Sequence, residues 1–316
     1  MMTITISVAL LGASIAYANI HQGRAVNAGL PPQSVLVDPK SFAVLPDDFS
    51  YRTDSFNQHF NPTNSQDFPT FQVFNGAFLD IIGSSPSISE IASNSSFAFA
   101  HEAPDHWAEQ MLSSGGSQTV NVPITQIPLP DSIQMTNGAT GPSNGNLILA
   151  NSGRGTIPST IALVNSKPPH NATFTRQVEI FSLRIPSMAS LTDSCSDGKT
   201  AYIADTGASG GKPTEPGTVY AFDVDPTTET FLNRRILAYI DAGVPDGLQV
   251  DVNGNVYTAC ADGVQVFDAD GTLLGKFFLD ISSANMVFAG PGRMVILAET
   301  KVFLAKIAPT TKGVVS

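Results

Sequence analysis

A short unit that recurs four times constrains the fold of this chain more than any other feature. Each copy has a tight turn, usually Asn-Gly or Asp-Gly, then a short apolar run, a connection, and a second apolar run. Glycine suits such turns because a positive φ costs little without a Cβ. The four copies occupy residues 144–165, 197–223, 253–268 and 292–305.

The spacing of the copies decides the class of all-β fold. They begin about 40–55 residues apart, which is the length of one four-stranded propeller blade, whereas a β-sandwich is not expected to repeat this unit. Short apolar runs between Gly, Asn, Asp and Pro already begin at Phe68, a texture typical of all-β proteins. The sequence therefore predicts an all-β fold, a β-propeller, over residues 67–310.

Composition and charge restrict the partners. The 316 residues are 42% hydrophobic and 14% charged, which suits a single large domain with an extensive core. The net charge of −11 argues against nucleic acid, because phosphate binding needs clustered Lys and Arg. Only three basic residues precede position 150: Arg24, Lys40 and Arg52. A small-molecule partner fits this balance better, and the oligomeric state is left open.

The first residues have the pattern of a secretion signal. Residues 3–18 are apolar and end in a small-x-small cleavage pattern, so we expect a signal peptide over residues 1–18. A signal anchor and a buried helix are the alternatives. Sequons at Asn94 and Asn171 add two expected glycosylation sites. The chain is therefore expected to be secreted, with no membrane association after cleavage, and residues 19–66 to be an extended lead-in.

Cysteine is sparse, with Cys195 and Cys260 alone. An oxidising compartment permits a bridge between them, and two separate buried thiols are the alternative. Neither lies in a Cys-x-x-Cys pattern or beside a plausible His partner, so a thiol nucleophile is not expected. A serine nucleophile is not expected either, because the chain contains no Gly-x-Ser-x-Gly.

The sequences of the repeats and of the segments that flank them resemble those of a known family. The segments that carry the likeness are residues 71–74, 78–83, 101–104, 151–158, 165–173, 202–207, 245–247, 263–264 and 284–290. Together they resemble the SMP-30/gluconolactonase/regucalcin-like family, especially its fungal secreted lactonohydrolase branch. The likeness extends from about residue 68 to residue 307, with one interruption.

The resemblance implies a six-bladed propeller with one divalent cation at the top of its central channel. The cation is usually Ca²⁺, with Mg²⁺ and Zn²⁺ as alternatives, and oxygen ligands suit the first two best. Glu102 and Asp246 match the family's Glu and Asp ligands. The cation is expected to polarise a lactone carbonyl, and Asp246 is the expected general base. Without the resemblance, residues in these settings are usually cap or turn residues, and that is the alternative for both carboxylates.

Three further residues are candidates for substrate binding. His101 precedes Glu102, and Asn137 and Asn285 lie where inner strands are expected to begin. A hydrogen-bonded structural histidine and two turn asparagines are the alternatives for these positions. The resemblance alone favours a pocket lined by these side chains.

The sequence departs from the family between residues 174 and 196. The family's Asn-Asp and Pro-Asn-Gly motifs are missing there, so about one blade and two oxygen ligands are absent. Three explanations are open: a mis-spliced or mis-predicted gene product, a genuine five-bladed or irregular paralogue with altered chemistry, and a degenerate, non-catalytic binding protein.

Two functions follow from the sequence. The first is a secreted, metal-dependent lactonohydrolase, and hence a carboxylic-ester hydrolase, acting on a small sugar-derived or aliphatic lactone, with secondary metabolism as a variant. The alternative is a catalytically degenerate propeller that acts as a binding protein. The missing motifs are the feature that motivates the second function.

Overall fold

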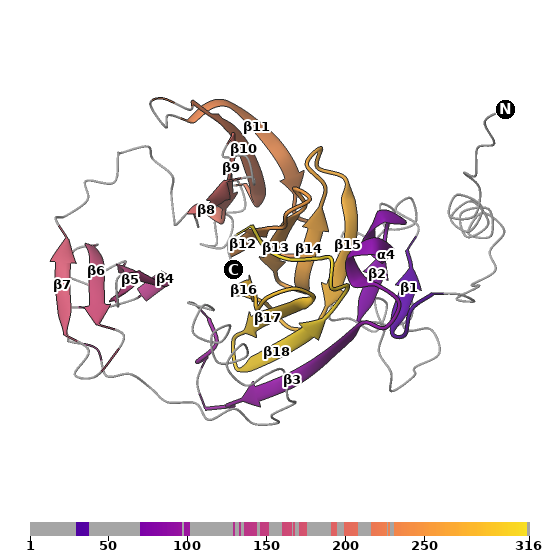
Figure 1. Cartoon of the computed structure of the whole chain (residues 1–316), viewed down its shortest axis with the longest axis horizontal. Coiled ribbons are helices and arrows are strands. Elements are labelled where there is room, and N and C mark those ends of the chain that lie inside the picture. Colours follow the sequence, from indigo (N-terminus) through magenta and orange to yellow (C-terminus); the bar gives the residue numbers. More distant parts are fainter. Residues whose placement is uncertain are drawn as a thin grey trace, which may run out of the picture.

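The protein is described as a computed structural model (Figure 1). The structure describes residues 30–37, 70–96, 98–101, 129, 133, 136–143, 146–151, 160–165, 167, 171–175, 191–194, 199–207, 216–225, 227 and 231–314. Within these residues the chain is built mainly of short strands, which form four sheets. The predicted signal peptide, Glu102 and Cys195 lie outside the described residues.

Two of the sheets are four-stranded antiparallel meanders of consecutive strands. The first consists of β4 (Thr136–Ser143), β5 (Asn146–Asn151), β6 (Thr160–Asn165) and β7 (Ala172–Thr175). The second consists of β8 (Leu191–Ser194), β9 (Thr200–Asp205), β10 (Thr218–Val224) and β11 (Phe231–Tyr239).

The other two sheets combine C-terminal strands with strands from the beginning of the chain. One has the order β1-β2-β15-β14-β13-β12 and the other β16-β17-β18-β3. The C-terminal strands are β12 (Leu248–Val250), β13 (Val256–Cys260), β14 (Gly263–Phe267), β15 (Leu273–Phe278), β16 (Asn285–Phe288), β17 (Arg293–Ala298) and β18 (Lys301–Lys306). The N-terminal strands are β1 (Ser34–Leu36), β2 (Phe71–Val73) and β3 (Ser87–Ser93). The pairing of β3 with β18 joins the two ends of the described fold.

The repeat predicted from the sequence is the central hairpin of each sheet. Its four copies form the second and third strands of successive meanders: β5 and β6, β9 and β10, β13 and β14, and β17 and β18. The innermost strand β12 packs against both β8 and β16, and these three sheets lie side by side around a common centre (Figure 1). The all-β prediction is confirmed, while the described residues show no closed ring and the number of blades stays a prediction.

Two segments differ from the expected pattern of secondary structure. The predicted lead-in contributes β1, which pairs in parallel with β2. Residues 77–82, expected among the short β-runs, form a helix instead, α4 (Ala77–Ile82). The reason is local, since Phe78, Ile81 and Ile82 follow helical spacing and all three side chains are buried. No helix within the described residues is long and apolar enough to cross a membrane.

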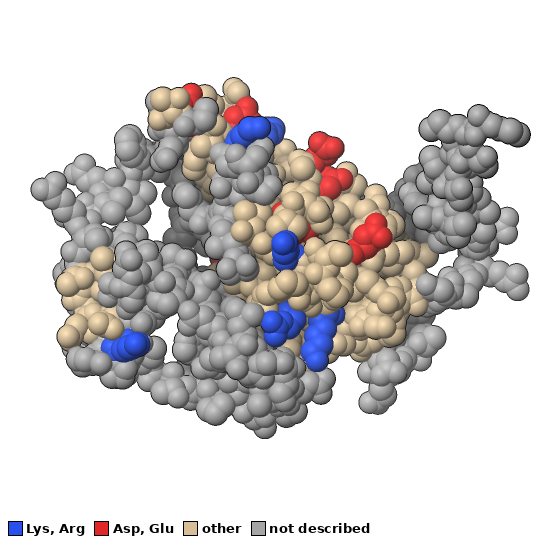
Figure 2. Space-filling view, in the orientation of Figure 1, with Lys and Arg blue, Asp and Glu red and all other residues tan. Residues whose placement is uncertain are grey.

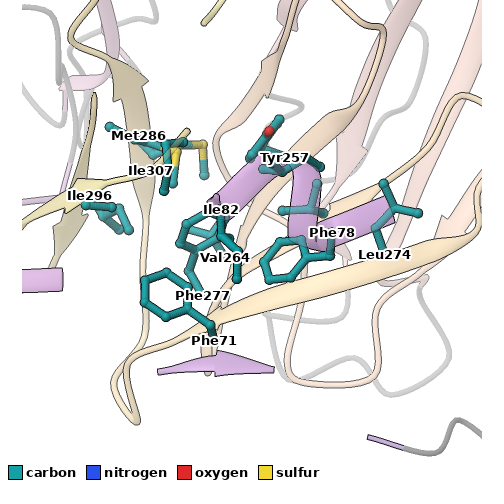
Figure 3. Packing of buried hydrophobic residues seen from close by; sticks show 14 of the residues in the cluster. Phe71, Phe78, Ile82, Tyr257, Val264, Leu274, Phe277, Met286, Ile296 and Ile307 are labelled. Carbon is teal, nitrogen blue, oxygen red and sulfur yellow. The ribbon is translucent and has the colours of Figure 1, made fainter. Parts of the chain in front are cut away.

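The largest core cluster joins α4 to the sheets around it (Figure 3). The Phe277 ring makes edge-on contacts with Phe71 and Phe78, at centroid distances of 5.7 and 5.5 Å. Gly275 makes the approach of α4 possible, because a Cβ there would lie 2.3 Å from the Phe78 ring. Aromatic packing of this kind therefore fixes the outer layer on the sheet that carries β12.

An ion cluster centred on the buried Lys276 and Asp262 of this sheet extends to the more exposed Asp241. The Lys276 ammonium, whose side chain is 1% exposed, donates to Asp241 at 2.8 Å and to Asp262 at 2.9 Å. Burial would lower the pKa of Lys276, but the two carboxylates outweigh it and raise that pKa. Burial raises the pKa of Asp262 against the opposing effect of Lys276. The cluster ties the segment that follows β11 to the β13–β14 hairpin and to β15.

Replacing Lys276 by Met tests how much this cluster contributes to stability. The variant leaves the carboxylates of Asp241 and Asp262 without their cation, so we expect a loss of about 3 kcal/mol in the free energy of unfolding. The matched control is Lys301→Met, which breaks the exposed pair with Glu90 and should cost less than about 1 kcal/mol. Denaturant unfolding of both variants measures the difference, and equal losses would contradict the expectation.

Candidate functional site

The site is built where two inner strands begin side by side. The Asp246 N–H donates to the Ala259 carbonyl at 2.9 Å, and the Gly247 N–H donates to the Ala284 carbonyl at 2.8 Å. These bonds tie the start of β12 to its own sheet and to the start of β16. Only glycine fits at position 247, because a Cβ there would lie 2.3 Å from the Asn285 Oδ1 atom. The Asn285 side chain therefore lies directly against the segment that carries Asp246.

Asp246 is an acidic group in an unfavourable environment. Burial raises the pKa of its carboxyl from 3.8 to about 6, the His101 imidazole opposes this rise, and Glu299 adds to it. Neither a hydrogen bond nor an ion pair to its carboxylate is found among the described residues. A carboxylate of this kind either takes up a proton or attracts a cation.

His101 and Glu299 form a pair next to Asp246. The His101 Nδ1 atom and the Glu299 Oε1 atom are 3.0 Å apart. The backbones are also joined, since the Ala100 N–H donates to the Glu299 carbonyl at 2.8 Å. The side chains of His101 and Glu299 are 45% and 33% exposed, so both remain accessible from solvent. The structure thus places an imidazole and a second carboxylate within electrostatic reach of Asp246.

The structure describes some of the predicted site residues and brings three of them into one region. Asp246, His101 and Asn285 come from three separate parts of the chain and lie in one region of the fold. Glu102 lies outside the described residues, and of Asn137 only its position in β4 is described. Within the described part of the chain, no three His, Cys, Asp or Glu side chains are grouped so as to hold a metal ion. The metal and catalytic assignments therefore stay predictions.

Glu299 is the residue that sequence reasoning missed. It lies in the two-residue turn between β17 and β18, where a carboxylate normally points into water. Its position opposite His101 depends on a contact between residues 198 positions apart. The only local signal was the turn itself, because the fourth repeat carries Glu-Thr where hairpin turns favour Asn or Gly.

The expected modification sites and the cysteines have mixed outcomes. Asn171 is exposed just before β7, whereas Asn94 is half-buried and its side-chain oxygen accepts from Ser96 N–H at 2.9 Å. Glycosylation stays a prediction at both. Cys260 is a buried free thiol, and burial raises its pKa well above the usual value. Burial thus disfavours its thiolate form, and because Cys195 lies outside the described residues the question of a bridge between the two cysteines stays open.

Figure 2 shows how the described charged side chains are distributed on one face of the molecule. The described Lys and Arg side chains on this face lie as separate groups among neutral and acidic residues. Binding to nucleic acid needs a continuous basic patch or stripe. This face offers none among the described residues.

Comparison with known proteins supports the resemblance stated from the sequence. Residues 194–298, which include Asp246 and Asn285, match the model of the SMP-30/Gluconolactonase/LRE-like region. An X-ray structure of a protein assigned as a gluconolactonase superposes with a TM-score of 0.51 at 15% identity, covering 77% of this chain and 99% of that one. The chain therefore has the fold of the gluconolactonase-like β-propellers, and the resemblance stated from its sequence is confirmed.

Two curated relatives are fungal lactonohydrolases. Lactonohydrolase oryH of Aspergillus oryzae is 37% identical over 112 residues, which are 30% of this chain and 24% of that protein. Lactonohydrolase oryL of the same organism is 30% identical over 132 residues, which are 37% of this chain and 30% of that protein. The chain thus matches less than a third of the length of either relative.

The desolvated carboxylate of Asp246 leads to a prediction about stability. Because folding raises its pKa from 3.8 to about 6, the folded state binds the proton more tightly than the unfolded state does. The stabilisation that this proton gives the folded state is therefore fully present below pH 4 and is lost as pH rises to about 6. In chelator, Asp246→Asn should therefore raise the free energy of unfolding at pH 7 by up to about 3 kcal/mol.

The measurement is denaturant unfolding of the wild type and of the variant from pH 4 to pH 7. The gap between the two curves should open over this range. Asp270→Asn, at an exposed position, is the control and should leave no such gap. A constant difference between the Asp246 variant and the wild type at every pH would contradict the raised pKa.

Proposed function

We propose that this protein is a secreted, metal-dependent lactonohydrolase that opens a small sugar-derived or aliphatic lactone. One observation carries the proposal: a desolvated carboxylate, Asp246, lies at the start of an inner strand within the region that matches the gluconolactonase family. Its raised pKa suits a general base that works near neutral pH. The two fungal lactonohydrolases support a lactone as substrate.

The donor set is compatible with a divalent cation, most simply Ca²⁺. No Lys or Arg among the described residues pairs with Asp246, so a cation would compensate its charge. Asn285 lies against the Asp246 segment, and Glu102 is the second carboxylate ligand that the family resemblance supplies. When bound, a divalent cation polarises a carbonyl oxygen and lowers the pKa of water.

The residues of the chain account for the rest of the chemistry. In its ionised form Asp246 takes a proton from a water molecule while that oxygen adds to the carbonyl carbon of the lactone. The ring C–O bond then breaks, and the departing oxygen takes up the proton, so that a hydroxy acid is formed. Asn285 is proposed to hold the ring in place through its amide.

Secretion and the role in metabolism belong to the same proposal. The apolar residues 1–18 and the two sequons support export, and an extracellular medium supplies Ca²⁺ without further provision. A lactone made in secondary metabolism is a natural substrate for a secreted enzyme of this class.

The activity is tested on purified protein with a panel of lactones and a pH indicator, because ring opening releases a proton. We expect hydrolysis that is lost in chelator and restored by Ca²⁺. Asp246→Asn should lower kcat/KM by about 10²–10⁴-fold, the range for loss of a general base.

The matched control is Asp270→Asn, which removes an exposed carboxylate outside the site and should retain wild-type activity. Melting curves confirm that both variants are folded. Activity that withstands chelator or the Asp246 variant would refute this mechanism. A wild type that opens no lactone, yet binds Ca²⁺ weakly, would instead support the degenerate binding protein.

A further inference from the structure

The conformation of Glu299 is unusual for its residue type. Glu299 has φ of 59°, in the left-handed region that disfavours side chains with a Cβ. Hairpin turns that need a positive φ normally take Gly, Asn or Asp. Such strain, of order 1–3 kcal/mol, persists where the surroundings enforce it and is concentrated at functional sites. The position therefore calls for a reason to keep glutamate.

The partner of Glu299 supplies that reason. Its carboxylate can only accept, so the His101 Nδ1 atom must donate across the 3.0 Å contact. In the neutral imidazole the other nitrogen, Nε2, is then a hydrogen-bond acceptor with a fixed direction. No hydrogen bond to Nε2 comes from the residues that the structure describes. The backbone bond from Ala100 to Glu299 holds the two residues in register.

The groups around this pair share one chemical property. Asp246, the second oxygen of Glu299 and the Nε2 atom of His101 all accept hydrogen bonds, and His101 and Glu299 are partly exposed. Such a group of acceptors is complementary to a ligand that presents several hydroxyl groups. It offers nothing to an aliphatic ring that lacks them.

We propose that Glu299 is a positioning residue: its carboxylate fixes the His101 ring so that Nε2 accepts a hydrogen bond from a ring hydroxyl of the lactone. The proposal rests on the proposed function and deepens it, because it assigns the choice between hydroxylated and plain lactones to this pair. Glu299 acts through His101, and of these two residues only His101 touches the substrate.

The decisive variant is Glu299→Gly. Glycine relieves the positive φ, so the melting temperature should stay the same or rise, by about 2–4 °C. The KM for glucono-1,5-lactone should nevertheless rise about tenfold, the usual effect of losing one good hydrogen bond. The kcat should change little, and hydrolysis of δ-valerolactone, which has no hydroxyl group, should be unaffected. A merely structural glutamate would give none of this selectivity.

A double-mutant cycle tests whether Glu299 acts through His101. His101→Ala should raise the same KM at least as much, and adding Glu299→Gly should have little further effect. Glu90→Gln, an exposed carboxylate in the same sheet, is the control and should leave both substrates unchanged. Additive effects of the two site variants would overturn the proposal, as would equal losses on both lactones.

Two binding measurements separate this proposal from the proposed function. Calorimetry with D-gluconolactam, which resists hydrolysis, should show about tenfold weaker binding to Glu299→Gly even if no lactone is turned over. Unchanged lactam affinity would overturn the role of Glu299. Calcium affinity should be the same in this variant and in the wild type. A loss of calcium affinity would make Glu299 a metal ligand and would also overturn the proposal.

Discussion

The backbone hydrogen bonds at the start of β12 are the constraint on which the site depends. Asp246 bonds to Ala259 in the next strand of its own sheet, and Gly247 bonds to Ala284 at the neighbouring inner strand. The first bond fixes the carboxylate relative to its sheet, and the second fixes that sheet relative to the next one. Because Gly247 has no Cβ, Asn285 can occupy the space beside it. A side chain at that position would separate the two strands and move Asp246 with them.

The charge of the acidic residues is compensated in one region of the fold and uncompensated in the other. Asp262 and Asp241 share the ammonium of Lys276, a cation drawn from an outer strand of the same sheet. Asp246 has no such cation among the described residues, and Glu299 adds further negative charge beside it. An uncompensated carboxylate is unfavourable for stability. It would serve the proposed function, because it leaves the site ready to accept a proton or a cation.

The sequence predicted the repeating architecture well because the repeat is local. An Asn-Gly or Asp-Gly turn between two apolar runs determines a hairpin whatever surrounds it, and all four copies became paired strands. The helix α4 was missed because six residues with apolar side chains at Phe78, Ile81 and Ile82 are too few to show a period against a β background. Glu299 was missed for a different reason. Its partner His101 comes from the other end of the chain, and a positive φ leaves no mark in the sequence of a non-glycine residue.

Backbone strain and uncompensated charge at the site both lower the stability of the folded state. A glutamate in the left-handed region and a desolvated aspartate each make the folded state less stable than an obvious substitution would. The His101–Glu299 hydrogen bond compensates only in part, because both side chains are partly exposed and a side-chain hydrogen bond contributes only about 1 kcal/mol. Two such residues near one imidazole, at the point where inner strands begin, are difficult to explain by folding alone. The proposed function gives a reason for both: a hydroxylated lactone would donate to the acceptors, and a divalent cation would compensate the carboxylate of Asp246.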